Sequence, residues 1–296
     1  MPEGVRTLKF TNPFEAPGSW LKANFHTHTT TSDGEFSAPE RVRQYREKGY
    51  RILAITDHDW TNDVSGLSDD EILVLSGMEV HPDCPGADSY HLVLLNVPHG
   101  FSRADEPDPN AIIRKVKLVG GEAIICHPYW CGHNVNHLLP IEGAVAVEVY
   151  NATCTKIGKG ISSVHWDDLL DAGRILPAVA VDDAHRGRDI FMGWTMIKAE
   201  VRDIESVMNA LRTGCFYASC GPVIEDARIA DGKLVVKCSP VSEVHFIAQR
   251  SNGRSFFADG EPLTEAEVAV PEAWRYVRVE IVDSQGRRAW TNPFVR

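Results

Sequence analysis

The chain has 296 residues, of which 43% are hydrophobic and 24% charged, and its formal net charge is −11. This composition is that of an ordinary globular protein, and the length fits one large domain or two unequal ones. The acidic balance argues against a nucleic acid partner, because binding to phosphate backbones needs a basic surface. No apolar run approaches the length of a membrane span, and Met1 to Ser19 lacks the apolar stretch of a secretory signal.

The seven cysteines of the chain are scattered along it without a Cys-x-x-Cys pair. Their odd number and spacing argue against a disulfide framework and against a zinc site built from cysteines. We therefore expect free thiols and a cytoplasmic location.

From about Ala23 to Thr213, short apolar runs alternate with amphipathic stretches. Near-continuous runs of Val, Ile, Leu and Ala suit strands that are covered on both faces, as in a parallel sheet. The predicted strands are Ala23–Thr27, Arg51–Thr56, Ile72–Val80, His91–Val97, Glu122–Cys126, Ala144–Tyr150 and Ile175–Val181. The predicted helices are Pro39–Lys48, Pro109–Val119, Ser163–Ala172 and Asp203–Arg212. Such alternation predicts an α/β fold.

One interval departs from this alternation. The gap between Val80 and His91 is too short for a helical crossover between parallel strands. The strands on either side of it are therefore expected to be antiparallel or otherwise irregular, and a perfect eightfold barrel is not expected.

After about Phe216 the helical signals stop, and pairs of strand-like runs flank turns such as Asp231-Gly232 and Asn252-Gly253. Turns that require positive φ select these dipeptides, so the pairs predict hairpins. They are Ala227–Ala230 with Lys233–Cys238, Glu243–Gln249 with Arg254–Ala258, and Tyr276–Asp283 with Arg287–Thr291. We predict a first domain at 1–215 and a small antiparallel sheet or sandwich at 216–296. For this second domain, a stabilising or oligomerising role is favoured over substrate recognition.

Histidines and carboxylates gather at the ends of the predicted strands. His26 and His28 are at i and i+2 on an extended segment, so their imidazoles point to one side and one divalent ion could take both. The candidate metal ligands, in chain order, are His26, His28, Asp33, His58, Glu79, His91, His127, Asp183 and His185. Scattered core histidines would not gather at one edge, and in α/β barrels the carboxyl edge of the strands carries the active site. The pattern therefore predicts a metal centre at this edge.

The types of ligand restrict the metal and the chemistry. Histidine and carboxylate without cysteine suit Zn, Mn or Fe. The candidates exceed what one tetrahedral site can use, so two or three divalent ions are expected. Ions that share a carboxylate lower the pKa of bound water and clamp the oxygens of a phosphoryl group. Such a centre would be net positive, which favours a small anionic substrate despite the acidic protein.

Neighbours of the predicted ligands leave alternatives open. Glu148 is equally well explained as a ligand, as the partner of a ligand or as half of an ion pair, and Asp182 is expected to orient a ligand. Arg186 and Arg188 could hold a substrate oxyanion bidentately, although a solvated surface role explains them equally well. His81 is predicted to line the mouth of the site and to contact the substrate.

The candidate catalytic residues are His185, Asp33 and His58. A histidine that is not fully committed to a metal could protonate the leaving group, and His185 is the first choice for that role.

Several segments resemble, in the same order, the motifs of the polymerase-and-histidinol-phosphatase (PHP) family. They are Phe25–His28 with Ser32–Gly34, Ile55–His58, Gly77–Val80, His91, Cys126–Pro128 and Asp183–His185. The resemblance covers about Ala23 to His185. It implies a distorted (β/α)7 barrel, related to the TIM barrel, with a two- or three-metal site that commonly hydrolyses phosphoesters.

The resemblance also implies a division of the ligands. One ion would be held by His26, His28, Glu79 and Asp183, a second by Glu79, His91 and His127, and a third by Asp33, His58 and His185. Asp33 stands where some members have a histidine, so occupancy of the third site is left open. The segments Trp20–Lys22 and Ala289–Pro293 look similar to a branch with carbaryl hydrolase-like members, which attack a carbamate or carboxylic ester.

The sequence therefore predicts a metal-dependent hydrolase, with a phosphoesterase acting on a small phosphorylated metabolite as the favoured hypothesis. The first alternative is a carboxylic ester or carbamate hydrolase with the same metal centre. The second is a metal-binding module without catalysis. No nucleic acid or membrane partner is expected, and the oligomeric state is left open.

Overall fold

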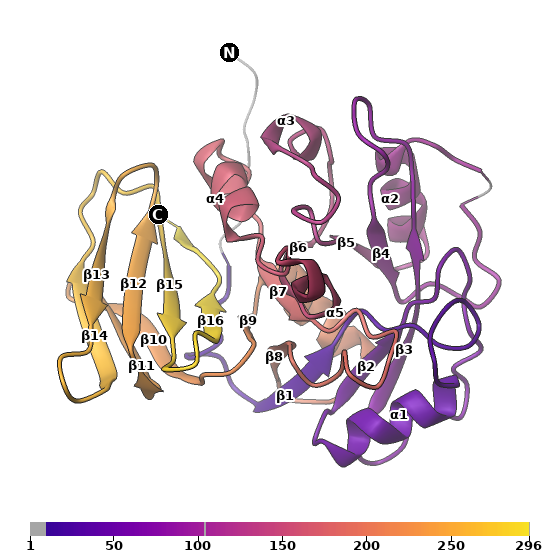
Figure 1. Cartoon of the computed structure of the whole chain (residues 1–296), viewed down its shortest axis with the longest axis horizontal. Coiled ribbons are helices and arrows are strands. Elements are labelled where there is room, and N and C mark those ends of the chain that lie inside the picture. The colour runs from indigo at the N-terminus through magenta and orange to yellow at the C-terminus, as the bar shows by residue number, and fades with distance from the viewer. Residues whose placement is uncertain (1–9, 104, 296) are drawn as a thin grey trace.

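The computed structural model describes residues 10–103 and 105–295. Seven neighbouring strands form the wall of a distorted barrel (Figure 1). They are β1 (Ser19–Asn24), β2 (Ile52–Ile55), β3 (Leu73–Val80), β4 (Leu92–Leu95), β5 (Glu122–Ile125), β6 (Ala146–Asn151) and β7 (Ala178–Val181). Beyond the ends of β1 and β7, a parallel bridge joins Thr27 to Ala184, with His28 N donating to Ala184 O at 3.0 Å. The predicted α/β barrel with seven strands is confirmed.

Strand β4 runs antiparallel to both of its neighbours, β3 and β5. Leu92 at the start of β4 pairs with Val80 at the end of β3 and with Ile125 at the end of β5. The prediction of an irregular pair at this point is confirmed. The reversal places His91, which precedes β4, at the rim where the parallel strands end.

Strand β1 is shorter at its carboxyl end than predicted. It ends at Asn24, so the prediction of a strand through Thr27 is wrong, and His26 lies beyond the strand. The Asn24 side chain provides the physical reason, because its Oδ1 accepts from the backbone N–H of His26 at 3.2 Å and its Nδ2 donates to Gly193 O at 3.1 Å. The chain therefore leaves the ladder toward the centre of the rim.

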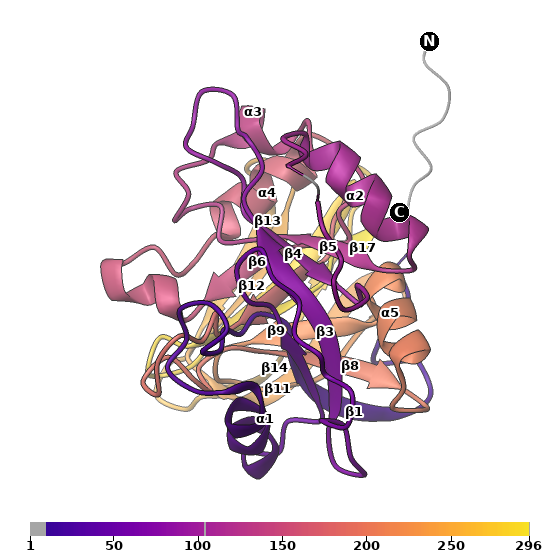
Figure 2. The same cartoon turned by 90° about the vertical axis from the view of Figure 1, so that its right-hand side faces the viewer.

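Helices cover the outer face of the strands (Figure 2). The helices that contact strands are α1 (Ala38–Glu47), α2 (Pro109–Leu118), α4 (Ser163–Asp171) and α5 (Ile204–Thr213), whereas the short α3 (Val135–Leu138) contacts α4. A 3-10 turn, η1 (Thr153–Ile157), follows β6. Aspartates cap two of the helices: Asp108 accepts from the N–H groups of Asn110 and Ala111, and Asp203 accepts from Ser206 N. No helix in 10–103 or 105–295 is both long and apolar enough to cross a membrane.

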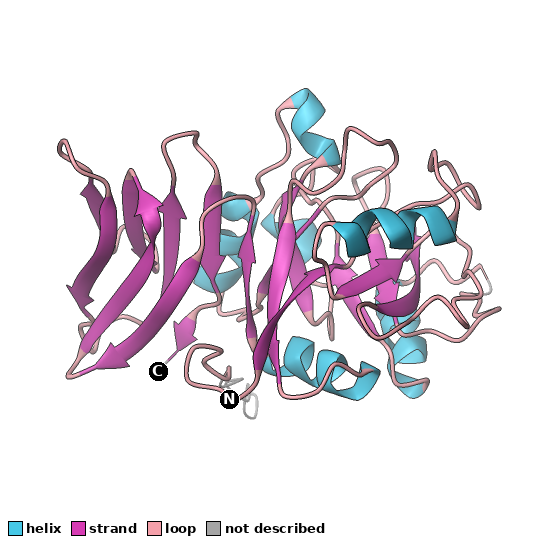
Figure 3. Ribbon diagram, turned by 90° about the horizontal axis from the view of Figure 1, so that it is seen from below, coloured by secondary structure: helices cyan, strands magenta, loops and turns pink. Residues whose placement is uncertain are grey.

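The sheet continues from β1 through two antiparallel strands into the C-terminal region (Figure 3). These are β8 (Trp194–Ala199) and β9 (Phe216–Ser219), followed in sheet order by β16 (Arg288–Thr291), β15 (Tyr276–Val282), β12 (Glu243–Ala248) and β13 (Gly253–Phe257), with β17 (Phe294–Val295) beside β15. A second sheet contains β10 (Ile224–Ala230), β11 (Lys233–Val241) and β14 (Leu263–Ala269). Val236, Phe246 and Val279 belong to the apolar core between the two sheets. The predicted C-terminal antiparallel region is confirmed, whereas the boundary at residue 215 stays a prediction.

Candidate metal centre

The structure brings all nine predicted ligands together at one rim of the barrel. In a central group, one side-chain atom of each residue lies within 4.8 Å of the others, and the members are His26, His28, Glu79 and Asp183. An outer group meets the same criterion with His28, Asp33, His58 and His185. The two remaining candidates, His91 and His127, contact Glu79 with their ring nitrogens at 2.7 and 3.3 Å. We propose that these groups bind metal ions, and the geometry of the carboxylates supports this.

Glu79 stands between two sets of histidines and is only 1% exposed. Its Oε1 lies 2.7 Å from His91 Nδ1 and 3.3 Å from His127 Nε2. On the other oxygen, Oε2, the ring nitrogens of three histidines converge: His58 Nδ1 at 3.0 Å, His26 Nε2 at 3.2 Å and His28 Nε2 at 3.4 Å. A carboxylate whose two oxygens face different sets of imidazoles has the geometry of a bridge between two cations.

Asp183 supplies the second carboxylate of the central group. Its Oδ1 lies 3.1 Å from His28 Nε2 and 3.3 Å from His26 Nε2, while those two ring nitrogens are 3.1 Å apart. The backbone of Asp183 is left-handed, with φ of 53°, and that of His127 has φ of 23°. Such conformations cost about 1–2 kcal/mol for residues other than glycine and are concentrated at functional sites.

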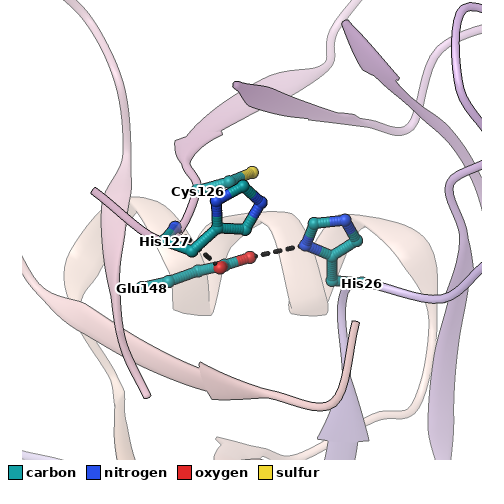
Figure 4. Close-up of side chains that lie close together, drawn as sticks. All are labelled: His26, Cys126, His127 and Glu148. Carbon is teal, nitrogen blue, oxygen red and sulfur yellow. Dashed lines mark hydrogen bonds and ion pairs between the residues drawn. The ribbon is translucent and has the colours of Figure 1, made fainter. Parts of the chain in front are cut away.

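Glu148 orients two of the histidines without joining the central group (Figure 4). Its Oε1 is 2.7 Å from His26 Nδ1, and its Oε2 accepts from the backbone N–H of His127 at 2.9 Å. A carboxylate on Nδ1 fixes the proton there, so the Nε2 lone pair of His26 points at the central group. Glu148 also forms a group with His26, Cys126 and His127 in which one side-chain atom of each lies within 4.8 Å of the others, so the choice between ligand and partner of a ligand stays open.

Two further residues shape the rim, and the sequence analysis assigned a role to neither. The Asp57 carboxylate accepts from Thr29 N at 2.7 Å and from Ser32 Oγ at 2.5 Å, which holds the loop that carries Asp33. The fully buried Arg41 donates to the backbone oxygens of His28 and His185 at 3.3 and 3.2 Å, which ties together the segments after β1 and β7. Asp57 could have been predicted at the rim because it is a carboxylate directly after an apolar run. Nothing in the sequence around Arg41 indicated its position.

Asp182 organises the loop beyond the predicted ligands. It accepts from Tyr45 Oη at 2.6 Å and from the N–H groups of Phe191, Met192 and Gly193 at 2.7–2.9 Å. Burial raises the pKa of this carboxyl to about 6, against the effect of those four donors. Asp182 thus acts on the site through the backbone that follows His185.

The pKa values of the central group depend on the opposite charges that lie beside each buried side chain. Burial would raise the pKa of Glu79, but His26 and the neighbouring imidazoles hold it well below its usual range. Burial would lower the pKa of His28, yet the Asp183 and Glu79 carboxylates raise it to about 9. The buried carboxylates therefore remain ionised only with positive charge beside them, supplied by protons on the histidines or by metal ions.

Several buried polar atoms in these groups have oppositely charged neighbours within ion-pair distance but make no well-aligned hydrogen bond to the residues that the structure describes. They are His28 Nδ1, His58 Nδ1 and Asp183 Oδ1. Unsatisfied buried groups are rare in folded proteins and need an explanation such as an ion. Imidazole and carboxylate donors in this arrangement fit divalent metals such as Zn, Mn or Fe.

The two ring nitrogens of His185 have different partners. Its Nδ1 donates to the backbone oxygen of Asp183 at 2.8 Å, which leaves the lone pair on Nε2, 3.3 Å from Asp33 Oδ2. Burial lowers the pKa of this ring, against the pull of the Asp183 carboxylate. A neutral imidazole with a free Nε2 suits a metal ligand, and catalytic roles for His185, Asp33 and His58 stay predictions.

A cavity of about 430 Å³ opens over the ligands. Arg186 and Arg188 line it, and Arg186 Nη1 donates to Asp33 O at 2.7 Å. His81 is not part of the lining, although its ring centroid lies 4.2 Å from that of His91. The lining also includes Trp130 and Lys156, which the sequence analysis did not select.

The C-terminal motif that resembles the carbaryl hydrolase-like branch has a structural role. Asn292 Nδ2 donates to Gly214 O and Phe216 O, both at 2.9 Å, and its Oδ1 accepts from Ala178 N at 3.0 Å. The motif thereby fastens the end of the chain to strand β7. Membership of that branch stays a prediction.

Comparisons with known proteins bear on the fold. No protein-family model matches the chain. A segment of 43 residues is 49% identical to an uncharacterised protein of Methanocaldococcus jannaschii, but the match spans 14% of this chain and 20% of that protein. The chain is structurally similar to an amidohydrolase from Chromobacterium violaceum, with 17% identity, a TM-score of 0.44, and coverage of 56% of this chain and 89% of that one.

A crystal structure from Bacteroides vulgatus matches this chain over nearly its whole length. It is a two-domain protein described as containing a predicted PHP-like metal-dependent phosphoesterase, with 16% identity, a TM-score of 0.55, and coverage of 95% of this chain and 96% of that one. The predicted resemblance is thereby confirmed at the level of the fold, since this chain shares the fold of that crystal structure.

Proposed function

We propose that this protein is a metal-dependent hydrolase that cleaves phosphoesters of small metabolites. The observation that carries the proposal is the position of Glu79, whose two oxygens face separate sets of histidines in a buried site. A site built in this way fits two neighbouring cations, and paired cations suit the in-line displacement of a phosphoester.

Several side chains of the rim would have a defined task in that reaction. The proposed ligands form three sets. The first is the central group with Glu79 and Asp183, the second is His91 and His127 beside Glu79, and the third is the outer group with Asp33. Divalent ions held there supply Lewis acidity and a water of lowered pKa. Glu148 keeps His26 in the tautomer that binds metal, and Arg41 holds the backbone of His28 and His185 in register.

The charges around the cavity favour an anionic substrate over a neutral carbamate or carboxylic ester. Arg186, Arg188 and Lys156 line it. Guanidinium groups bind phosphate oxygens bidentately, and an ammonium adds a point charge. The cavity of about 430 Å³ suits a small metabolite, and the net charge of −11 favours such a substrate over a nucleic acid.

The test is a comparison of substrates on protein reconstituted with Mn, Zn or Fe. We expect turnover of p-nitrophenyl phosphate or bis-p-nitrophenyl phosphate, in proportion to the metal content found by elemental analysis. Turnover of a naphthyl carbamate alone would establish the ester or carbamate alternative. Equal rates from metal-free and metal-loaded protein would contradict a metal-dependent reaction of either kind.

A further inference from the structure

The cavity above the candidate metal centre has an aromatic wall formed by Trp130. This side chain is 43% exposed, and it lines the cavity. Its ring meets those of His91 and His127 edge to face, with centroids 5.4 and 5.2 Å away. Trp130 is therefore packed on one side against two predicted ligands, while much of the indole remains uncovered.

The backbone around Trp130 is fixed by a tight turn. The N–H groups of Trp130 and Cys131 both donate to His127 O, at 2.9 and 3.2 Å, and His133 N donates to Pro128 O at 3.0 Å. An aromatic side chain on such a turn needs little further ordering when a ligand stacks on it. The indole is thus a preorganised apolar surface beside the reaction centre.

The cationic part of the same cavity is also fixed. Lys156 Nζ lies 2.8 Å from Oδ1 of the buried Asp189, whose Oδ2 accepts from Arg186 N at 2.9 Å. Arg186 reaches the Asp33 loop, whereas Trp130 contacts the histidines on Glu79 Oε1. Cationic and aromatic groups therefore adjoin different parts of the ligand cluster.

From this arrangement we infer that Trp130 is a specificity-determining residue that stacks on the leaving group of the substrate. The substrate class is a phosphorylated compound whose leaving group carries a flat aromatic ring close to the ester oxygen. The phosphoryl oxygens face Arg186 and Lys156, and the ring lies on the uncovered indole. This inference rests on the proposed phosphoesterase function and adds the nature of the leaving group.

The test uses two phosphonates that the enzyme cannot hydrolyse, phenylphosphonate and cyclohexylphosphonate. At a pH above the second pKa of both compounds they carry the same charge, and they have similar size, but only the first is flat and aromatic. Calorimetric titration of the metal-loaded full chain should give a dissociation constant about three- to tenfold lower for phenylphosphonate, the size of an aromatic pair contribution.

Substitutions of Trp130 test whether this side chain causes the preference for phenylphosphonate over cyclohexylphosphonate. Trp130→Ala should remove the preference for the phenyl compound and raise KM for p-nitrophenyl phosphate with little change in kcat, whereas Trp130→Phe should retain most of it. Trp60→Ala is the matched control, because Trp60 is 60% exposed and lies outside the lining of this cavity. Metal content and melting temperature, measured on every variant, show whether the centre has stayed intact.

The outcomes separate the two proposals. Equal affinity of the wild-type protein for both phosphonates, with phosphoester turnover present, overturns the aromatic subsite and leaves the phosphoesterase function standing. A preference that survives in Trp130→Ala also overturns the role of this residue. Failure of both phosphonates to bind, without turnover of any phosphoester, overturns the proposed function and the inference with it.

Discussion

Two buried clusters of charge, one at the barrel rim and one between α4 and the C-terminal sheet, differ in how they are neutralised. At the rim, Glu79 and Asp183 are surrounded by imidazoles, and Asp183 Oδ1 has no hydrogen-bond partner among the described residues. At the C-terminal cluster, Arg278 forms a bidentate pair with Asp167, with both distances 2.7 Å, and a contact of 3.0 Å with Glu280.

The two clusters differ in whether the side chains of the chain alone neutralise the buried charge. The arginine at the C-terminal cluster is 1% exposed, but its carboxylate partners belong to the same chain, so folding alone satisfies it. The rim gathers ionisable groups that can be satisfied together only by protons or by added cations. The first cluster is therefore expected to set stability, and the second to set metal content and activity.

The largest effect is expected at the rim, from Glu79→Gln. The substitution removes the negative charge between the two sets of histidines, so activity should fall by more than about 10³-fold and the metal content by one ion or more. Turnover assays with elemental analysis measure both. Glu267→Gln, on an exposed ion pair of the second sheet, is the matched control, and wild-type turnover by Glu79→Gln would contradict the bridging role.

The corresponding change at the C-terminal cluster is Arg278→Met. It leaves Asp167 and Glu280 without their shared partner, so the free energy of unfolding should fall by about 3–5 kcal/mol. Urea denaturation measures the loss. The metal content per folded molecule should stay at the wild-type level, and a parallel loss of metal would show that the two clusters are not independent.

A smaller effect is expected from Glu148→Gln. The neutral amide still reaches His26 but orients the ring less strongly, so metal affinity should fall by about 10- to 100-fold while the protein remains folded. Competition with a chromogenic chelator gives the affinity. An unchanged affinity would mean that His26 does not depend on Glu148 for its tautomer.

The smallest effect concerns pH and Glu280. Burial would raise the pKa of this carboxyl, but Arg278 and Arg288 lower it below the usual value of 4.5. Its contribution to stability is therefore complete above pH 4.5 and declines as the pH falls through the lowered value in the folded protein. Urea denaturation of metal-free wild-type and Glu280→Gln proteins at pH 7 and pH 3 should show a smaller difference at the lower pH. A larger difference in the free energy of unfolding between the two proteins at pH 3 than at pH 7 would contradict the expected lowering of the Glu280 pKa.

Several fully buried strands were predicted from the sequence, whereas some partly exposed strands were missed. Strands such as β2 and β7 were found because they are buried along their whole length and read as continuous apolar runs. Strand β8 was missed, since its residues alternate between buried and half-buried and include Lys198. Strand β14 was missed because it is mostly exposed and contains Glu265 and Glu267.

The order of apolar runs and ligand-type residues along the chain was enough to predict which side chains meet at the rim. The ligands follow apolar runs, and the ends of neighbouring strands must lie close together once the barrel forms. This is a local property of the chain, which is why residues as distant as His26 and Asp183 could be placed in one site before any coordinates were known.

The resemblance to the PHP family already implied that Glu79 is shared between two ions, but the contacts of individual atoms follow from the packing of distant segments. That Glu79 turns one oxygen to His91 and the other to His58, and that Arg41 holds a backbone oxygen 144 residues away, depends on contacts between distant segments. The position of Trp130 over the ligands depends on the turn after β5 in the same way. Periodicity along a chain fixes which face a residue lies on, whereas the atom it contacts is fixed by packing in three dimensions.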